Sequence, residues 1–328
     1  MGVITKPKIS IITPCFNAIE YIEQTITSIL NQGYSNLEYI IIDGGSTDGT
    51  VEIIKKYENQ ISYWVSESDK GQSHAINKGI EKATGDVFNW VNADDYLEDG
   101  VLEMVGKCFQ DSSINMVCAK TIFIRPDGSM YENVSTDFSR GLNNVLNSRG
   151  LNQMGMFWKL DRVKQLKGVN TDFNFAMDLD LWKRYLLMFG LGGIVKKDFV
   201  VGYFRLLETS KTGVDMAVNA SFFDEENNAA LVQYAHELGS GYVESVKLLF
   251  PNYKKELANK NVHTELPSQV LKTWLLELFY EKAKRFFYAN DFKNAYLLLN
   301  SLPLKDFSGE EMKNLKSFKR WSALKRWM

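Results

Sequence analysis

Two adjacent carboxylates follow a short apolar run in the sequence. Val87–Val91 predicts a buried strand, and the segment Asn92-Ala93-Asp94-Asp95 comes directly after it. Neighbouring carboxylates repel each other unless solvent or a cation relieves the repulsion. Carboxylate oxygens suit Mg²⁺ or Mn²⁺, which bind such groups together with substrate phosphates. The alternative is a solvated loop in which Asp94 or Asp95 caps a helix that begins near Tyr96. Taken alone, the pair fits either interpretation.

Three further polar segments also follow predicted strands. The predicted strands are Ile9–Thr13, Tyr39–Ile42 and Ile61–Val65, and the polar segments at their ends are 13–17, 43–48 and 67–72. The helices predicted between the strands are 20–30, 51–57 and 73–83. Alternation of strands and helices predicts an α/β fold, with a mostly parallel sheet flanked by helices. Such a sheet binds ligands at the carboxyl ends of its strands, so we expect the four polar segments to form one site.

The second half of the chain carries weaker patterns. Asn143–Gln153 is polar and predicts a loop, Asp178–Phe189 predicts a helix, and Val195–Phe204 predicts a closing strand. From about Ala217 onward the sequence predicts helices almost throughout. We therefore expect an α/β domain over residues 1–215 and a helical C-terminal region over residues 216–328.

Composition excludes several classes of protein. The chain has 328 residues, a net charge of -2 and 45% hydrophobic residues, which favours a globular protein over a nucleic-acid-binding one. Its three cysteines show no CxxC spacing, so we expect a reducing compartment. The sequence shows no secretory signal, and no apolar run approaches the roughly 20 residues of a membrane span. These features predict a cytoplasmic protein.

The order and spacing of four segments resemble one enzyme family. The segments are Ser10–Asn17, Ile42–Thr50, Asp69–Gly79 and Asn92–Asp95. Together they closely resemble the family 2 glycosyltransferases, which have the GT-A fold. The resemblance is strong over residues 8 to about 100 and continues more weakly to about 213. It implies transfer of a sugar from a nucleotide-diphospho-sugar.

The resemblance also implies roles for individual residues. Asp43 would accept a hydrogen bond from the nucleotide base, as the family's aspartate does with uracil. Asp94 and Asp95 match a DxD-type motif that holds Mn²⁺ or Mg²⁺ against the diphosphate, and Asp95 is favoured as the direct ligand. Asn92 would be either a neutral oxygen ligand or a residue behind the ligands. The donor-binding residues that the resemblance implies are Thr13, Pro14, Phe16, Asn17, Asp43, Asp69, Gly71, Asn77, Asn92, Asp94, Arg205 and Lys211.

The sequence departs from the family pattern at two positions. Gly44 stands where the family often has a second aspartate, so base recognition and the choice of uridine would rest on Asp43. The Gly44-Gly45 pair also fits a simple tight turn. Leu207 stands where the family often has a histidine near the diphosphate. Arg205 or Lys211 would then assist the leaving group.

The segment Phe175–Arg184 supplies the candidate catalytic base. It resembles the family's acidic helix start, where an aspartate deprotonates the acceptor hydroxyl, and Asp178 holds that position. The alternative is that Asp178 merely stabilises a helix N-terminus. We expect Asp180, Lys183 and Arg184 to be surface or supporting groups. In this family the sugar is transferred by direct displacement with inversion, and the acceptor would be a saccharide or a lipid-linked saccharide in cell-surface glycan assembly.

Two other functions compete with this one. A sugar nucleotidyltransferase should carry a Gly-rich loop with Lys or Arg after the first strand, where this chain has Pro14–Asn17. A catalytically inactive scaffold subunit would keep the fold and lose the carboxylates. Both alternatives fit less well, because the four aspartates at positions 43, 94, 95 and 178 are all present.

The C-terminal segment Lys313–Met328 is basic and amphipathic. It has six Lys or Arg residues and no acidic one, and its apolar residues recur at three- and four-residue steps. These apolar residues are Leu315, Phe318, Trp321, Leu324 and Met328. Such a helix either lies in the headgroup layer of an anionic membrane or docks on the preceding helices. The first alternative predicts peripheral contact with the inner face of the membrane.

Overall fold

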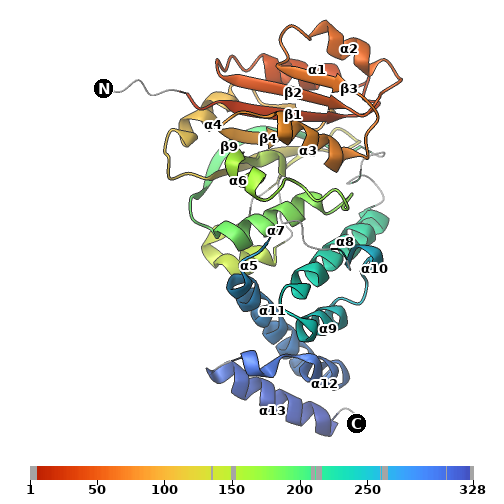
Figure 1. Ribbon diagram of the computed structural model, residues 1–328, viewed down its shortest axis with the longest axis vertical. Coiled ribbons are helices and arrows are strands. Elements are labelled where there is room, and N and C mark those ends of the chain that lie inside the picture. The colour runs from red at the N-terminus through yellow and green to blue at the C-terminus, as the bar shows by residue number, and fades with distance from the viewer. Residues whose placement is uncertain are drawn as a thin grey trace. The chain divides into compact units, whose positions relative to one another are not determined.

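The computed structural model describes residues 6–133, 136–148, 153–207, 211, 216–258, 260, 265–307 and 309–325. Contacts divide the chain into two compact units, Met1–Ala220 and Ser221–Met328 (Figure 1). The predicted boundary near Asp215 falls outside the described residues. The two units are therefore considered one at a time.

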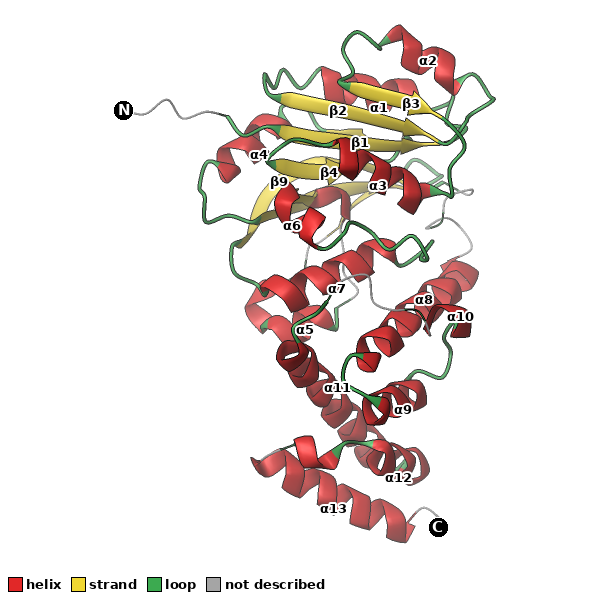
Figure 2. Cartoon of the chain, viewed as in Figure 1, coloured by secondary structure: helices red, strands yellow, loops and turns green. Residues whose placement is uncertain are grey.

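A single sheet organises the first unit (Figure 2). Eight strands of its described residues follow the order β3-β2-β1-β4-β8-β6-β9-β5, and a ninth, β7, pairs with β6. The strands are β1 Ile9–Cys15, β2 Leu37–Asp43, β3 Tyr63–Ser66, β4 Val87–Trp90, β5 Tyr96–Leu97, β6 Met116–Ile124, β7 Met130–Asn133, β8 Met156–Lys159 and β9 Ile194–Arg205.

The sheet is parallel on one side and mixed on the other. Strands β3, β2, β1 and β4 run parallel, and their register aligns Cys15, Asp43 and Ser66 at one edge. Strand β8 is antiparallel to both β4 and β6, whereas β9 runs parallel to β6. Crossover helices impose parallel pairing only where they alternate with strands, and this pattern ends after β4. The predicted α/β fold is confirmed, with its parallel part confined to the first four strands.

Helices cover both faces of the parallel strands. Ile22, Ile26 and Ile29 of α1 belong to the same buried cluster as Ile9 and Ile11 of β1. Helix α3 packs on the opposite face (Figure 1), where Gly79 lies against the side chain of Ile12 in β1. A Cβ at position 79 would lie 2.5 Å from that side chain, so glycine permits the close helix–sheet contact.

The helices of this unit are α1 Ile22–Leu30, α2 Thr50–Lys56, α3 Gln72–Lys82, α4 Val101–Phe109, α5 Leu142–Leu146, α6 Leu160–Gln165 and α7 Met177–Phe189, with short 3₁₀ helices at Phe138–Arg140 and Gln153–Gly155.

Helix α7 is held by a buried ion pair that the sequence did not predict. Arg184 is 0% exposed, and its Nε donates to Asp180 Oδ2 at 2.7 Å. The same guanidinium donates to the carbonyl oxygens of Leu166 and Gly168 at 2.7 and 2.9 Å. We expected these residues to be either surface groups or supporting groups. Asp180 and Arg184 are both buried, so the surface alternative is wrong. These contacts fix the helix that carries Asp178.

The second unit consists of helices. They are α8 Met216–His236, which begins just before the unit does, α9 Ser240–Leu249, α10 Lys255–Ala258, α11 Ser268–Tyr288, α12 Phe292–Ser301 and α13 Gly309–Lys325, with a 3₁₀ helix at Leu304–Asp306. Helix α13 lies against α11 and α12, and it buries Leu315 and Phe318 of the predicted apolar face. Trp321 and Leu324 stay exposed, and residues 326–328 lie outside the described part. None of the helices in the described ranges is both long and apolar enough to cross a membrane.

Candidate functional site

Asp43 organises the turn that follows β2. It is 0% exposed, and its Oδ2 accepts hydrogen bonds from the backbone N–H groups of Gly45 and Ser46 at 3.1 and 2.9 Å. The hydroxyl of Ser66, at the end of β3, donates to the same oxygen at 2.6 Å, and the Ser46 hydroxyl donates to Oδ1 at 2.5 Å. All four donors come from the protein. Direct contact of Asp43 with a base therefore stays a prediction, and the structure gives it a positioning role.

Gly44 lies between an exposed aromatic ring and a carboxylate. A Cβ at this position would lie 3.2 Å from Oδ2 of Asp69 and 3.3 Å from Cδ2 of Phe16. The Phe16 ring is 64% exposed, and Asp69 Oδ1 accepts a hydrogen bond from the N–H of Gly71 at 2.7 Å. A flat apolar ring beside a hydrogen-bond acceptor is what a nucleotide base requires, because the ring stacks and the acceptor reads an N–H. Phe16, Asp69 and Gly71 thus lie close together, and their role in donor binding stays a prediction.

Two of the predicted donor-binding side chains have other partners. Thr13 is 0% exposed, and its hydroxyl lies 3.1 Å from that of Tyr39 in the interior. Asn77 exchanges two hydrogen bonds with the backbone of Val169, at 2.8 and 2.9 Å. These contacts account for both side chains, so we reassign Thr13 to the core and Asn77 to positioning the loop before α7. These hydrogen-bond partners could not be seen from residue type.

Pro14 and Asn17 shape the loop after β1. Pro14 is buried within β1 and pairs in register with Ile42. Asn17 has a positive φ of 47°, and its Oδ1 accepts from the N–H of Thr47 at 3.0 Å. Its own N–H donates to the hydroxyl of Ser46 at 2.7 Å. Asn17 therefore ties the loops after β1 and β2 together and holds the neighbouring Phe16 at the surface.

The carboxylate pair lies directly beyond β4. Asp95 is 1% exposed, and its two oxygens accept from the backbone N–H of Arg205 at 2.9 Å and from Asn92 Nδ2 at 3.1 Å. Burial, followed by the charge of Asp94, raises the pKa of Asp95 well above its usual range. Burial also raises the pKa of the partly exposed Asp94. The positive charge of Arg205 opposes both rises and does not cancel them, so the ionised forms of both carboxyl groups stay disfavoured.

A divalent cation fits this deficit of positive charge. In the described residues, no group of three or more His, Cys, Asp or Glu side chains is arranged to hold a metal. Mg²⁺ and Mn²⁺ are commonly held by one or two carboxylates, with substrate phosphates and water completing the shell. Asp94 and Asp95 supply that number of carboxylates. Because Asp94 is the more exposed of the two, the structure favours it as the direct ligand, whereas the sequence favoured Asp95.

Arg205 is fixed beside the pair at the end of β9. Its guanidinium donates to the backbone carbonyl of Asp94 and, at 2.6 Å, to Oε1 of Gln24. The ring centres of Tyr21 and Tyr96 lie 4.9 and 4.7 Å from it. A guanidinium enclosed by two rings loses little further entropy when it meets an anion. Arg205 is therefore placed to face a phosphate group next to Asp94.

A chain of hydrogen bonds joins the carboxylate pair to the loop before α7. Asn92 binds Asp95, and its Oδ1 accepts from Gln72 Nε2 at 2.8 Å. Gln72 Oε1 accepts from Lys211 Nζ at 2.9 Å, and Lys211 also donates to the carbonyl of Asn174 at 2.7 Å. Gln72, the first residue of α3, had no role in the sequence-based interpretation. Its position could have indicated a role, because Gln72 directly follows Gly71 within the segment Asp69–Gly79 that resembles the family.

Asp178 is the second residue of α7 and lies near Lys211. Its Oδ1 accepts from the N–H of Leu179 at 2.7 Å. Burial raises the pKa of Asp178 to about 6, and the charge of Lys211 opposes this rise. A carboxylate with such a pKa is ionised at neutral pH and is still basic enough to take a proton. The structure thus brings a candidate base and the carboxylate pair into one connected site.

The family of the chain follows from comparison with known proteins. The model of glycosyl transferase family 2 matches residues 10–177. The chain belongs to this family. The matched residues include the turn after β2 and the carboxylate pair of Asp94 and Asp95.

Two curated relatives and one solved structure extend this assignment. An uncharacterized glycosyltransferase of Haemophilus influenzae is 30% identical over 178 residues, which cover 52% of this chain and 71% of that protein. TuaG of Bacillus subtilis, named for teichuronic acid biosynthesis, is 40% identical over 101 residues, which cover 30% of this chain and only 40% of TuaG. The crystal structure of S. aureus TarS 1-349 with UDP has a TM-score of 0.56 and 15% identity, covering 96% of this chain and 88% of that one. The last comparison concerns the fold alone, which is of the GT-A type.

Proposed function

We propose that this protein transfers a sugar from a nucleotide-diphospho-sugar to a hydroxyl group of a saccharide or lipid-linked acceptor, with inversion at the anomeric carbon. One observation carries the proposal: the chain of contacts Asp95–Asn92–Gln72–Lys211 leads from the carboxylate pair to the neighbourhood of Asp178. A diphosphate at the pair would have its sugar directed toward the base. Neither a nucleotidyltransferase nor an inactive scaffold requires a base there.

The residues of the chain divide the reaction between them. Asp178 takes the proton of the acceptor hydroxyl as its oxygen attacks the anomeric carbon, and the bond from that carbon to the diphosphate breaks on the opposite side. Arg205 and Lys211 are cations near the leaving diphosphate and stabilise its charge. Asp94 and Asp95 would hold Mn²⁺ or Mg²⁺, which when bound supplies further neutralisation of the diphosphate.

The exposed ring of Phe16 and the carboxylate of Asp69 would bind the base of the donor. We propose uridine, because the turn ordered by Asp43 resembles the uracil-binding turn of the family and TarS was crystallised with UDP. Gly44 leaves the space between Phe16 and Asp69 open, since a side chain there would have to displace one of them. The name of TuaG, which refers to teichuronic acid biosynthesis, supports a role in cell-surface glycan synthesis.

A screen of nucleotide-sugars tests the donor. Purified protein is incubated with Mn²⁺ and, in turn, with UDP-, GDP-, CDP- and dTDP-sugars, and the release of free nucleotide is measured. We expect release from at least one UDP-sugar and none in excess chelator. Release from GDP-sugars alone would contradict the choice of uridine, and no release from any donor would contradict the proposed activity.

The pKa of Asp178 predicts the pH dependence of the reaction. The carboxyl must be ionised to accept a proton, so kcat is expected to rise as the pH increases through about 6 and to level off above it. Removing the nearby cation in Lys211→Met should raise that pKa and move the rising limb to higher pH, whereas Lys55→Met, on the exposed side of α2, should not. A pH–rate profile of the three proteins would show this. An unchanged limb in Lys211→Met would mean that another group titrates.

Contact of α13 with an anionic membrane stays a prediction separate from this chemistry. The exposed side chains of Trp321 and Leu324 support it, and the basic residues of the helix add to this support. The burial of Leu315 and Phe318 weakens it, because these two residues pack inside the helical unit. The vesicle experiment described below tests it.

A further inference from the structure

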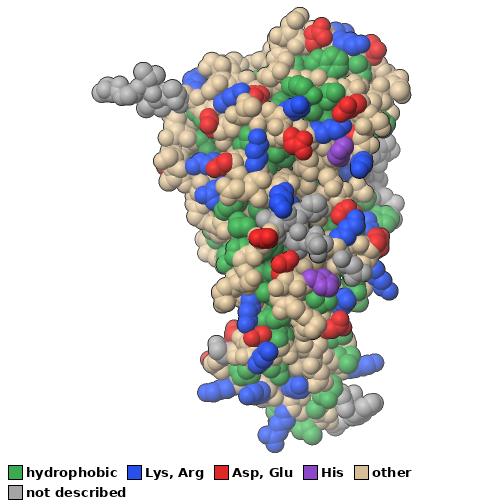
Figure 3. Space-filling model, in the orientation of Figure 1, with side chains coloured by type: hydrophobic (Ala, Val, Ile, Leu, Met, Phe, Trp, Pro, Cys, Tyr) green, Lys and Arg blue, Asp and Glu red, His purple; other side chains and the backbone are tan. Residues whose placement is uncertain are grey.

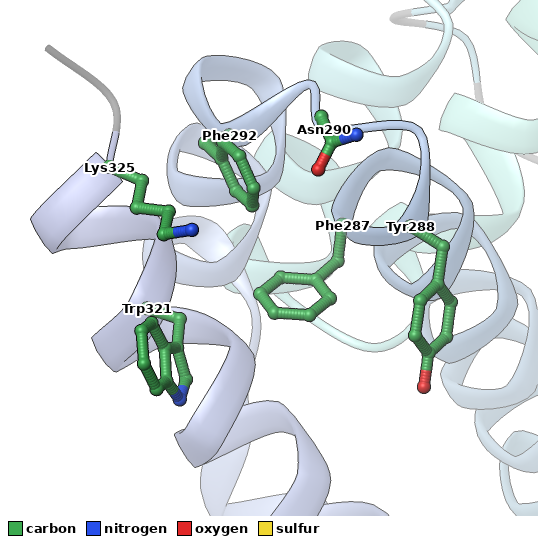
Figure 4. Close-up of a pocket in the computed structure, with 6 residues that line it drawn as sticks. All are labelled: Phe287, Tyr288, Asn290, Phe292, Trp321 and Lys325. Carbon is green, nitrogen blue, oxygen red and sulfur yellow. The ribbon is translucent and has the colours of Figure 1, made fainter. Parts of the chain in front are cut away.

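The helical unit contains an aromatic pocket far along the sequence from the residues discussed above. It lies where the end of α11, the start of α12 and the end of α13 meet (Figure 4). Its volume is about 210 Å³, and its lining consists of Phe287, Tyr288, Asn290, Phe292, Trp321 and Lys325. Pockets for drug-sized ligands hold roughly 300–1,000 Å³. The space therefore suits a smaller group, such as one sugar ring.

The walls of the pocket combine exposed aromatic rings with two polar groups. Tyr288 is 69% exposed and Trp321 is 50% exposed, which is unusual for such large apolar side chains that pack beside others. The Nζ atom of Lys325 lies 5.7 Å from the ring centres of both Phe292 and Trp321. Figure 4 shows the ammonium of Lys325 and the ring of Phe287 directed toward the same space. An apolar wall with a few fixed polar groups is typical of a small-molecule site.

The charged residues around the pocket indicate the charge of the ligand that it binds. Residues 312–325 contain Lys313, Lys316, Lys319, Arg320 and Lys325, and no acidic residue. Figure 3 shows Lys and Arg side chains gathered over α12 and α13. Asp291 lies between the lining residues Asn290 and Phe292, and the five cations of α13 outnumber it. A net positive charge attracts anions and repels cations, so a quaternary ammonium group is a poor candidate for this aromatic pocket. The ligand should carry negative charge.

The packing of α13 favours a saccharide over a membrane. A helix that lies in the headgroup layer needs its whole apolar face free, whereas α13 uses Leu315 and Phe318 to bind the other helices. The Phe318 ring stacks on that of Phe287, with 4.5 Å between the ring centres. Of the large apolar side chains that are exposed in the described part of α13, Trp321 lines a concave pocket and Leu324 lies outside it. A concave aromatic surface suits a ring-shaped ligand.

We propose that this pocket binds one sugar residue of an anionic saccharide and so holds the acceptor chain. The apolar C–H face of a pyranose packs against the ring of Trp321, while Asn290 and Lys325 bind its hydroxyl groups and its carboxylate or phosphate. The assignment to the acceptor rests on the proposed function, but binding itself does not. The pocket is a second site on the chain, distinct from the residues that surround Asp178.

Titration of the full chain with defined saccharides tests the proposal. The anionic probes are a hyaluronan hexasaccharide, which carries carboxylates, and a ribitol phosphate oligomer, and the neutral probe is maltohexaose. We expect at least one anionic probe to bind, and Trp321→Ala and Lys325→Gln each to weaken that binding about tenfold, since stacking and charge each contribute on the order of a tenfold effect. Lys313→Gln, an exposed change on the same helix outside the pocket, should weaken it less than about twofold. Thermal unfolding of each variant verifies that it folds.

The outcomes separate the alternatives. Equal binding of maltohexaose and the anionic probes, or unchanged binding in Trp321→Ala, would overturn the proposal. Cosedimentation with phosphatidylglycerol-containing vesicles that depends on Trp321, with no binding of either anionic saccharide, would assign the pocket to a membrane instead. Release of nucleotide from the donor with water as acceptor should be equal in all variants. If the wild type released none, the proposed function would fail while the binding result would stand.

Discussion

Replacing Asp178 with asparagine is expected to lower kcat about 10²–10⁴-fold, the usual contribution of a general base. The substitution keeps the size of the side chain and removes its basicity, so the dissociation constant of the nucleotide-sugar should stay close to that of the wild type. The residue is held by the N–H of Leu179, and its amide oxygen can accept the same hydrogen bond. Calorimetry of donor binding and a transfer assay on the same preparation measure the two effects.

Asp161→Asn provides the matched control for this variant. Asp161 is an exposed aspartate in the first turn of α6, so its replacement removes a carboxylate from a helix start without touching the site. Its kcat should equal that of the wild type. Loss of donor binding together with activity in Asp178→Asn would show that Asp178 is a ligand or a structural residue and does not act as the base.

Replacing either member of the carboxylate pair is expected to lower kcat by about 10³-fold or more, since a metal ion at the diphosphate contributes several kcal/mol to the transition state. The variants are Asp94→Asn and Asp95→Asn, and the wild type in excess chelator should lose activity to a similar extent. Asp95 is 1% exposed and bonded to Asn92 and Arg205, so its variant should also be less stable, whereas the Asp94 variant should unfold at the wild-type temperature. Assays across a Mn²⁺ titration, with unfolding curves, separate these effects.

Asp99→Asn is the control for the pair. Asp99 is exposed and lies four residues beyond Asp95, so its loss changes the local charge without removing a candidate ligand. It should keep wild-type activity at every Mn²⁺ concentration. Full activity of the wild type in chelator, or normal turnover in both pair variants, would exclude a role for a divalent cation bound by these carboxylates.

The sequence predicted the parallel half of the fold because its signals there are local. Apolar runs of strand length alternate with helical periodicity from Ile9 to Trp90, and β1, β2 and β3 are neighbours both along the chain and in the sheet. The mixed half depends on pairing between β4, β8, β6 and β9, which are distant in sequence. Long-range pairing of this kind leaves no periodic trace in one chain. Only β9 was predicted from that half.

The candidate site shows the same limit at the level of single residues. Asp94, Asp95 and Asp178 could be found because carboxylates at strand and helix ends are chemically conspicuous. Asn77 and Thr13 stood in recognised segments, yet their side chains bind the backbone of Val169 and the hydroxyl of Tyr39. Gln72 was missed, since an amide carries no charge and its role depends on partners from other elements. Residue type shows which chemistry a side chain could perform, whereas its hydrogen-bond partners determine whether the side chain is available for it.

The stereochemistry of the product tests most directly the claim that Asp178 and the carboxylate pair form one site for direct displacement. Proton NMR of the glycoside first formed from an α-linked nucleotide-diphospho-sugar, with the donor that the screen identifies, measures the configuration at the anomeric carbon. A single attack assisted by one base predicts a β-linked product. An α-linked product would require either a second displacement or attack from the same side as the leaving diphosphate, and it would contradict the account.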